Sequence, residues 1–306
     1  MQLAIVGPGG VGGYFGGRLA EAGNDVTFLA RGAHLAAMQA NGLRIESPAG
    51  AARIRVRATD DPAAVGPVDL VLLTVKRYDV EATLPQIRPL VGPQTLVVPF
   101  QNGVDMIAEL TTAFGAAHAA GGTAHITAAV VEPGVIRHTA LDRLIVGMPD
   151  GAEDPRLVWL RNAGRAAGFD AVLSPRIAVE IWMKFTRLTV FSGMTAICRT
   201  SIGPIRRDPA LRRLMADAWR ESMAVAQAHG IALPSDMFDQ MQSTIDQLPD
   251  EARSSMLGDL ERGRRLELPW LSGAMVRLAE AVGVDVPTHR LFVALLGPHV
   301  RGRAGA

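Results

Sequence analysis

The chain has 306 residues, of which 48% are apolar and 20% are charged, and its formal net charge is +1. This length accommodates two domains of about 100–200 residues each, and the small net charge argues against partners that bind through a strong electric field, such as nucleic acid or an anionic membrane. No apolar run approaches the roughly 18 residues of a membrane-spanning helix, and the single Cys198 cannot form an intrachain disulfide, so we expect a cytoplasmic protein.

The chain starts with a strand, a glycine-rich turn and a helix. An apolar run, Leu3–Val6, leads into Gly7, Gly9 and Gly12, which have the G-x-G-x-x-G spacing, and a helical pattern follows to about Ala22. This order is typical of dinucleotide binding, because the glycines allow a tight turn, the approach of a pyrophosphate and close helix–strand packing. The N–H groups at the helix start attract phosphate charge. A purely structural glycine turn is the alternative; the predicted pyrophosphate contacts are Gly7, Gly9, Gly10, Val11 and Gly12.

Short apolar runs then alternate with helical patterns up to about residue 175. Buried parallel strands are predicted at Val26–Leu29, Leu70–Val75 and Leu96–Pro99, and helices near residues 34–41, 80–87 and 105–114. The runs Leu43–Ile45 and Arg53–Arg57 indicate an antiparallel insertion. The segment 119–146 favours a meander added to the sheet, with strands at Thr127–Val131, Val135–His138 and Leu144–Val146. A helix at 155–167 and a strand at 171–173 complete this part.

After Ser174-Pro175 helical periodicity dominates. Helices are predicted at 177–191, 211–229, 235–248, 268–282 and 289–296, and the tail 301–306 is expected to fray. We therefore predict an α/β fold with two domains. Residues 1–175 form a Rossmann-type doubly wound sheet with an added antiparallel β segment, and residues 176–306 form an all-α domain.

The end of the second strand bears on the choice of cofactor. An NAD site places a carboxylate there, which accepts a hydrogen bond from the ribose 2′-OH. This strand instead ends in Ala30 and Arg31, and Asp25 lies at its opposite end. A guanidinium can pair with a 2′-phosphate, so Arg31 favours NADPH, with a solvated surface arginine as the alternative.

Polar residues at two other places are candidates for the reaction itself. Lys76 and Asn102 follow the third and fourth main strands, at the sheet edge where such folds bind ligands, although each could be an ordinary loop residue. Glu180 and Lys184 share one stripe of an otherwise apolar helix, where they could equally form a surface ion pair. Glu267 lies just before Pro269 and could be only a helix-start carboxylate.

The whole chain resembles the ketopantoate reductase (2-dehydropantoate 2-reductase) family. The matching features run in family order over about residues 3–296: Gly7-x-Gly9-x-x-Gly12, Arg31, Thr74-Val75-Lys76, Gln101-Asn102-Gly103-Val104, Glu180-Ile-Trp-x-Lys184, Ser254-Ser255-Met256-Leu257 and Leu266-Glu267-Leu268. The resemblance implies a Rossmann domain followed by a helical domain, with the site in the cleft between them, and the reduction of a 2-oxo acid.

The resemblance also implies a role for each matched residue. Lys184 would be the general acid that protonates the developing 2-alkoxide, and Glu267 would hold Lys184 or a substrate hydroxyl. Ser255 would bind the substrate carboxylate. Asn102 would lie at the nicotinamide end of the cofactor and Lys76 close by, so both are counted among the cofactor contacts, and Asn102 among the substrate contacts as well.

This sequence departs from the family pattern at two substrate positions. Leu188 and Ser192 stand four and eight residues after Lys184, where better-known members have asparagine. Leucine offers no hydrogen bond, so the pocket could suit another branched or more apolar 2-oxo acid than ketopantoate. A β-hydroxyacid dehydrogenase and a non-catalytic NADP-binding sensor are the alternative functions.

The remaining signals predict little chemistry. No histidine has metal-ligand spacing, so we expect no metal. The basic stretch around Arg206-Arg207 and Arg212-Arg213 is expected to be a solvated helix face. Trp219, Met223 and Ala226 share one stripe of a long helix and are either core or the face of a homodimer formed through the helical domain.

Overall fold

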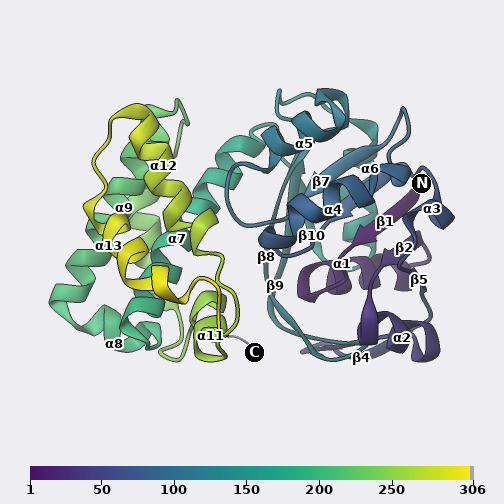
Figure 1. The fold of residues 1–306 in the computed structure, drawn as a ribbon, viewed down its shortest axis with the longest axis horizontal. Coiled ribbons are helices and arrows are strands. Elements are labelled where there is room, and N and C mark those ends of the chain that lie inside the picture. The colour runs from purple at the N-terminus through teal and green to yellow at the C-terminus, as the bar shows by residue number, and fades with distance from the viewer. Residues whose placement is uncertain (304–306) are drawn as a thin grey trace. The chain divides into compact units, whose positions relative to one another are not determined.

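The computed structural model describes residues 1–303, which fold into two compact units (Figure 1). The sheet unit comprises Met1–Gln101 and Asp105–Glu180, and the helical unit comprises Asn102–Val104 and the described residues 181–303. Within the tail that the sequence predicts to fray, the N–H groups of Gly302 and Arg303 donate to His299 O at 3.0 Å and Gly263 O at 2.7 Å. For 304–306 that expectation lies outside the described residues.

The main sheet of the sheet unit is fully parallel and has the strand order β5-β2-β1-β6-β7. Its strands are β1 (Gln2–Val6), β2 (Asp25–Leu29), β5 (Arg57–Thr59), β6 (Leu70–Leu73) and β7 (Leu96–Pro99). The chain runs outward in one direction from β1 to β2 and in the other from β1 to β6. This reversal beside β1 creates the point at which doubly wound sheets bind ligands beyond their carboxyl ends.

Both faces of the main sheet are buried, which explains its nearly continuous apolar strands. Successive side chains of β1 point to opposite faces: Leu3 and Ile5 pack in one cluster, Ala4 and Val6 in another. The first cluster includes side chains of α1 (Gly10–Glu21) and α6 (Pro155–Ala166). The second includes side chains of α4 (Val80–Gln86) and α5 (Met106–Phe114). The remaining helices are α2 (Gly32–Asn41) and α3 (Pro62–Val65).

A second, mixed sheet corrects two sequence predictions. It has the order β10-β9-β3-β4, with β8 paired to β9, and comprises β3 (Leu43–Ser47), β4 (Gly50–Ile54), β8 (Gly121–Glu132), β9 (Val135–Gly147) and β10 (Asp170–Leu173). The predicted three-stranded meander is wrong, because two long antiparallel strands occupy the segment, and they belong to this sheet rather than the main one. The predicted insertion is divided: β4 pairs antiparallel with β3, whereas β5 joins the main sheet beside β2.

The helical unit contains seven helices within its described residues. They are α7 (Ile177–Cys198), whose first turn belongs to the sheet unit, α8 (Ile202–Arg207), α9 (Pro209–Ala228), α10 (Met237–Gln247), α11 (Ser255–Glu261), α12 (Ser272–Val282) and α13 (Pro287–Leu296). The sequence predicted neither α8 nor α11, which are too short for an apolar stripe to be recognised. Pro269 divides the predicted helix 268–282, so a 3₁₀ turn at Leu268–Trp270 precedes α12.

The apolar stripe of α9 is core. Trp219 and Ala226 are fully buried and Met223 packs against the same interior, together with residues of α7, α10 and α13. The structure thus decides between the two alternatives that the sequence left open for this stripe.

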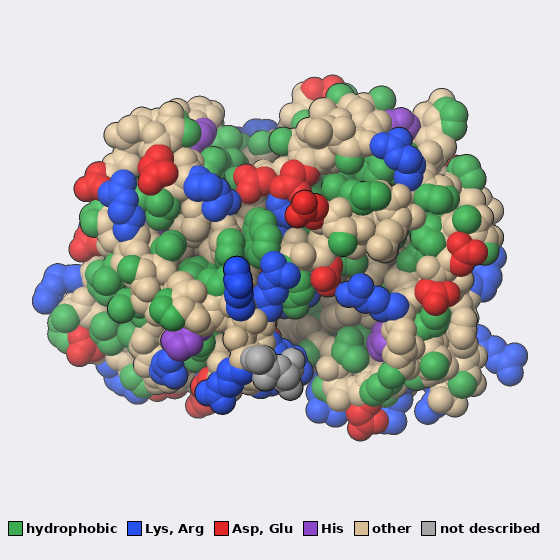
Figure 2. All heavy atoms as spheres, in the orientation of Figure 1, with side chains coloured by type: hydrophobic (Ala, Val, Ile, Leu, Met, Phe, Trp, Pro, Cys, Tyr) green, Lys and Arg blue, Asp and Glu red, His purple; other side chains and the backbone are tan. Residues whose placement is uncertain are grey.

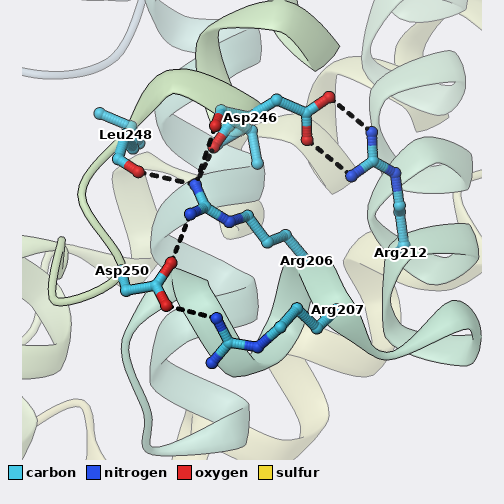
Figure 3. Close-up of polar contacts among 7 residues, drawn as sticks. Arg206, Arg207, Arg212, Asp246, Leu248 and Asp250 are labelled. Carbon is cyan, nitrogen blue, oxygen red and sulfur yellow. Dashed lines mark hydrogen bonds and ion pairs between the residues drawn. The ribbon is translucent and has the colours of Figure 1, made fainter.

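Arg206 corrects the expectation of a solvated basic face. Its guanidinium is half-buried and donates to the carbonyls of Ile245, Asp246 and Leu248 at the end of α10, at 3.0, 3.1 and 2.6 Å. It also pairs with Asp250 (Figure 3). These contacts satisfy carbonyl groups that a helix end leaves open. Arg207 and Arg212, which pair with Asp250 and Asp246, are more exposed.

The predicted fold class is confirmed: a Rossmann-type parallel sheet, an added β region and a helical C-terminal part. Figure 2 shows basic and acidic side chains interspersed over the face in view, in keeping with the small net charge. None of the helices within residues 1–303 is both long enough and apolar enough to cross a membrane.

Candidate active site

The glycine-rich loop lies between β1 and α1, at the carboxyl edge of the main sheet. Gly7 has a backbone φ of +84°, which residues other than glycine rarely adopt. Its N–H donates to Leu29 O on the neighbouring strand at 3.1 Å. The Thr74 hydroxyl, just beyond β6, donates to Gly7 O at 2.8 Å. The turn is therefore fixed from both neighbouring strands, β2 and β6.

The glycines of this loop differ in what surrounds them. A Cβ on Gly12 would lie 2.9 Å from both Gly7 O and Ile5 Cγ2 and would also meet Thr74 Oγ1. A Cβ on Gly10 would meet the Ala128 carbonyl of β8. A Cβ on Gly9 would have only Gly7 O, at 3.9 Å, within 4 Å. Gly10 and Gly12 are thus required by the protein's own packing, whereas the space beside Gly9 is open and fits a pyrophosphate.

Helix α1 starts in this open space without a side-chain cap. Gly9 is its N-cap residue and offers no side chain for its first N–H groups, and there is no acidic residue in the first turn. The N–H groups of Gly10, Val11 and Gly12 have no intrahelical acceptor, and the helix dipole adds partial positive charge at this end. These are the properties of an anion-binding helix start.

The end of β2 carries no carboxylate, as the sequence indicates. Asp25 starts β2, where it pairs with Arg57, and Arg31 is the N-cap residue of α2. The Arg31 side chain is 82% exposed, and its Nη2 lies 3.2 Å from Asp79 Oδ2. Such an exposed pair is weak, so the guanidinium remains available to an incoming anion. Lys76, also exposed, follows β6 by three residues.

The second group of predicted residues meets in the helical unit. Lys184 lies on α7 and is partly buried, and Glu267, 8% exposed, precedes the 3₁₀ turn at Leu268–Trp270. Asn102 Nδ2 donates to Glu267 Oε2 at 3.0 Å, although 165 positions separate the two residues. Burial lowers the pKa of Lys184 to about 8, while the charge of Glu267 opposes this shift and that of Arg187 adds to it. The Lys184 ammonium can therefore give up its proton near neutral pH.

Arg187 is the residue here that sequence analysis missed. It is partly buried one turn after Lys184, and burial lowers the pKa of its guanidinium. Spacing of three on a helix places Arg187 and Lys184 on neighbouring positions of one face. That spacing was the available signal, since a second cation beside a candidate general acid influences its protonation.

The other predicted substrate residues lie along α7 and at the start of α11. Leu188 is half-buried and packs against the apolar cluster of the helical unit. Ser192 is 1% exposed, and its hydroxyl has no hydrogen-bond partner within the described part of the chain. Ser255 is exposed and is the first residue of α11. The preceding Ser254 caps α11 through the Leu257 N–H at 3.0 Å and bonds the buried Thr195 hydroxyl of α7 at 2.7 Å.

A glycine turn with an uncapped helix start in a Rossmann-type sheet, and a partly buried lysine of lowered pKa in the helical unit, are features typical of dinucleotide-dependent oxidoreductases. Comparisons with known proteins agree. The family model "Ketopantoate reductase PanE/ApbA" matches residues 3–151, and its C-terminal counterpart matches residues 176–299. The chain therefore belongs to the ketopantoate reductase family, whose members are NAD(P)H-dependent oxidoreductases.

Individual relatives extend over the full length. A 2-dehydropantoate 2-reductase of Mesorhizobium japonicum is 31% identical over 97% of each chain. The crystal structure of a 2-dehydropantoate 2-reductase from Geobacter metallireducens is 30% identical and superposes with a TM-score of 0.92, covering 97% of this chain and 99% of that one. A D-mandelate dehydrogenase solved with NADH and anilino(oxo)acetate shares the fold, with a TM-score of 0.88 over 98% of each chain at 20% identity.

Proposed function

We propose that the protein reduces 2-dehydropantoate (ketopantoate), or a closely related 2-oxo acid, with NADPH, and that Lys184 is the general acid. The observation that carries this proposal is the lowered pKa of the Lys184 ammonium beside Glu267, in a chain of the ketopantoate reductase family. A proton donor with a pKa near the working pH is the efficient choice for carbonyl reduction.

NADPH is preferred over NADH in this proposal. Arg31 presents a guanidinium at the end of β2, where NAD-dependent sites have a carboxylate, and the nearest acid of that strand, Asp25, lies at its far end. The open space at Gly9 and the first-turn N–H groups of α1 would hold the pyrophosphate. Lys76 and Asn102 are the proposed contacts toward the nicotinamide. When bound, the reduced nicotinamide supplies the hydride.

The protein's own residues supply charge, position and a proton. As C2 of the substrate accepts the hydride, its carbonyl oxygen becomes an alkoxide, which the Lys184 ammonium stabilises and then protonates. Glu267 keeps the lysine charged until that moment, because its negative charge opposes the effect of burial. Asn102 fixes the Glu267 carboxylate through their 3.0 Å hydrogen bond, and Ser255 is the proposed contact for the substrate carboxylate.

Leu188 and Ser192, the proposed contacts of the substrate's side chain, stand where better-known members of the family have asparagine. Leu188 contributes an apolar surface and Ser192 a buried hydroxyl, so a 2-oxo acid with a branched or apolar side chain fits these residues as well as ketopantoate does. We further propose a cytoplasmic enzyme that forms a homodimer through a surface of its helical unit other than the buried stripe of α9. Light scattering of the purified protein would test the dimeric state.

The proposal is tested by following NADPH absorbance with ketopantoate and a panel of apolar 2-oxo acids and 3-hydroxy acids. We expect turnover of a 2-oxo acid, higher kcat/KM with NADPH than with NADH, and loss of that preference in Arg31→Ala. Lys184→Met should bind NADPH normally but lose turnover by about 10²-fold or more. Equal kcat/KM for the two cofactors would refute the Arg31 assignment.

Two glycine variants separate cofactor binding from folding. Gly9→Ala should fold as the wild type does and bind NADPH poorly, because its Cβ meets open space that we assign to the pyrophosphate. Gly12→Ala should lose stability as well, because its Cβ would meet Gly7 and Ile5. Tight NADPH binding without turnover of any substrate would support a sensor instead of an enzyme, and turnover by Lys184→Met at the wild-type rate would remove the general acid.

A further inference from the structure

His34 lies on α2 and contacts two segments that are distant in the sequence. Its Nε2 is 2.9 Å from the carbonyl oxygen of Pro8, inside the glycine-rich loop. The N–H of Gly134, in the tight turn between β8 and β9, donates to its Nδ1 at 3.0 Å. The ring is half-buried, and Pro8 is buried. Pro8 lies inside the motif that predicted the cofactor site, whereas His34 and Gly134 lie outside it.

These two partners define the protonation state of the ring. A backbone N–H can only donate, so Nδ1 must be an unprotonated acceptor, and a carbonyl can only accept, so Nε2 must carry the hydrogen. His34 is therefore neutral when both bonds exist. An imidazolium would carry a hydrogen on Nδ1 as well and would set two donors, its own N–H and that of Gly134, against each other.

The Pro8 carbonyl is a sensitive place for such a contact. It belongs to the same peptide plane as the Gly9 N–H, which donates to Gly7 O at 2.7 Å, and Gly9 is the N-cap of α1. On the other side, the loop rests on β8, where the Ala128 carbonyl leaves no room for a side chain at Gly10. His34 thus ties the peptide before α1 to α2, whose N-cap residue is Arg31.

We propose that His34 is a positioning residue for the cofactor, which sets the glycine-rich loop relative to α2 and weakens NADP(H) binding when it becomes protonated. The inference rests on the proposed dinucleotide site. His34 does not touch the reacting atoms, and its effect on the cofactor passes through the Pro8–Gly9 peptide and through α2.

The pH range follows from the groups around the ring. Burial lowers the pKa of His34, and the hydrogen bond to the Pro8 carbonyl opposes this shift. The charged residues nearest along its three neighbouring segments are Arg31 at the start of α2 and Glu132 before the β8–β9 turn, while the loop segment from Gly7 to Gly13 contributes no charge. Protonation therefore becomes appreciable only below the ordinary histidine range, and the loss of affinity is expected on the acid side of pH 6.5.

The test compares NADP⁺ dissociation constants of the wild type, His34→Gln and His34→Phe by calorimetry between pH 7.5 and 5.0. Glutamine keeps an uncharged donor for Pro8, so its Kd at pH 7.5 should stay within about threefold of the wild type. Phenylalanine keeps the ring shape but loses both bonds, so its Kd should rise about tenfold at pH 7.5. His118→Gln is the matched control, because His118 bonds a carbonyl, Thr95 O at 2.8 Å, elsewhere in the sheet unit.

The decisive readout is the ratio of the wild-type Kd to the His34→Gln Kd. The 2′-phosphate titrates near pH 6, but it does so with both proteins and cancels in this ratio. We expect the ratio to rise about threefold or more from pH 7.5 to 5.0, with thermal midpoints showing that both proteins stay folded. A constant ratio, or wild-type affinity in His34→Phe, would overturn the inference while leaving the proposed function intact. If the wild type bound neither NADP⁺ nor NADPH, both proposals would fail.

Discussion

Replacing Glu267 by glutamine should move the pH range over which the enzyme works. Glutamine retains an oxygen that can accept the hydrogen bond of Asn102 Nδ2, but it removes the negative charge that helps Lys184 to hold its proton. The protein around Lys184 should otherwise be unchanged. The variant therefore isolates the electrostatic effect of one carboxylate on one ammonium.

The structure indicates the size of the effect. The pKa of Lys184 falls from 10.5 to about 8 even with Glu267 present, so burial and Arg187 together outweigh this carboxylate. At ~1.36 kcal/mol per pKa unit, the remaining shift corresponds to about 3 kcal/mol against the charged form. An opposite charge within a few ångströms changes a pKa by about one to three units, so Glu267→Gln should bring the pKa of Lys184 to about 7 or below.

The assay is kcat/KM for NADPH oxidation between pH 6 and 9.5. A general acid must be protonated, so wild-type activity should fall above about pH 8, and that descending limb should move about one unit or more toward acid in Glu267→Gln. Arg187→Gln is the matched variant on the same helix, and it should move the limb in the opposite direction. A limb that stays in place in Glu267→Gln, or that moves the same way in both variants, would refute the electrostatic coupling.

Three further changes test stability. Lys184→Met should abolish activity and raise the free energy of unfolding at pH 7 by about 2 kcal/mol, because the folded state no longer holds a partly buried ammonium. Urea titrations measure this change. Equal or lower stability of the variant would contradict the desolvation of the Lys184 ammonium. Burial lowers the pKa of His289 to about 4, so the unfolded chain takes up a proton below about pH 6.5 while the folded protein stays neutral. Stability should therefore be full above pH 6.5 and fall by up to about 3 kcal/mol toward pH 4, a slope that His289→Phe should reduce. Arg206→Ala should lower the free energy of unfolding by about 1–3 kcal/mol, because it leaves the end of α10 without its hydrogen-bond donor (Figure 3). Arg207 is more exposed, so Arg207→Ala should lower it by less than about 1 kcal/mol. Similar losses of stability in thermal unfolding would show that burial does not distinguish the two arginines.

Local sequence determined the parts of this protein that depend on neighbours in the chain. The strand–glycine–helix order of residues 3–22 could be predicted because a buried parallel strand, a left-handed turn and a helix each impose their own residue types. Gly7 shows this directly, with its φ of +84°. The four predicted main strands begin and end within two residues of those observed, since strands buried on both faces are apolar throughout.

Tertiary structure alone decided which distant residues meet. Nothing in the sequence indicates that Asn102 bonds Glu267, that Arg206 closes the end of α10, or that His34 reaches Pro8 and Gly134. Strand pairing was equally hidden: β4 joins the second sheet and β5 the main sheet, although the two short strands follow one another closely in the sequence. Hydrophobic periodicity shows which face of a helix or strand is buried. Which other element covers that face is decided by packing across the whole chain, and the lowered pKa of Lys184 follows from that packing.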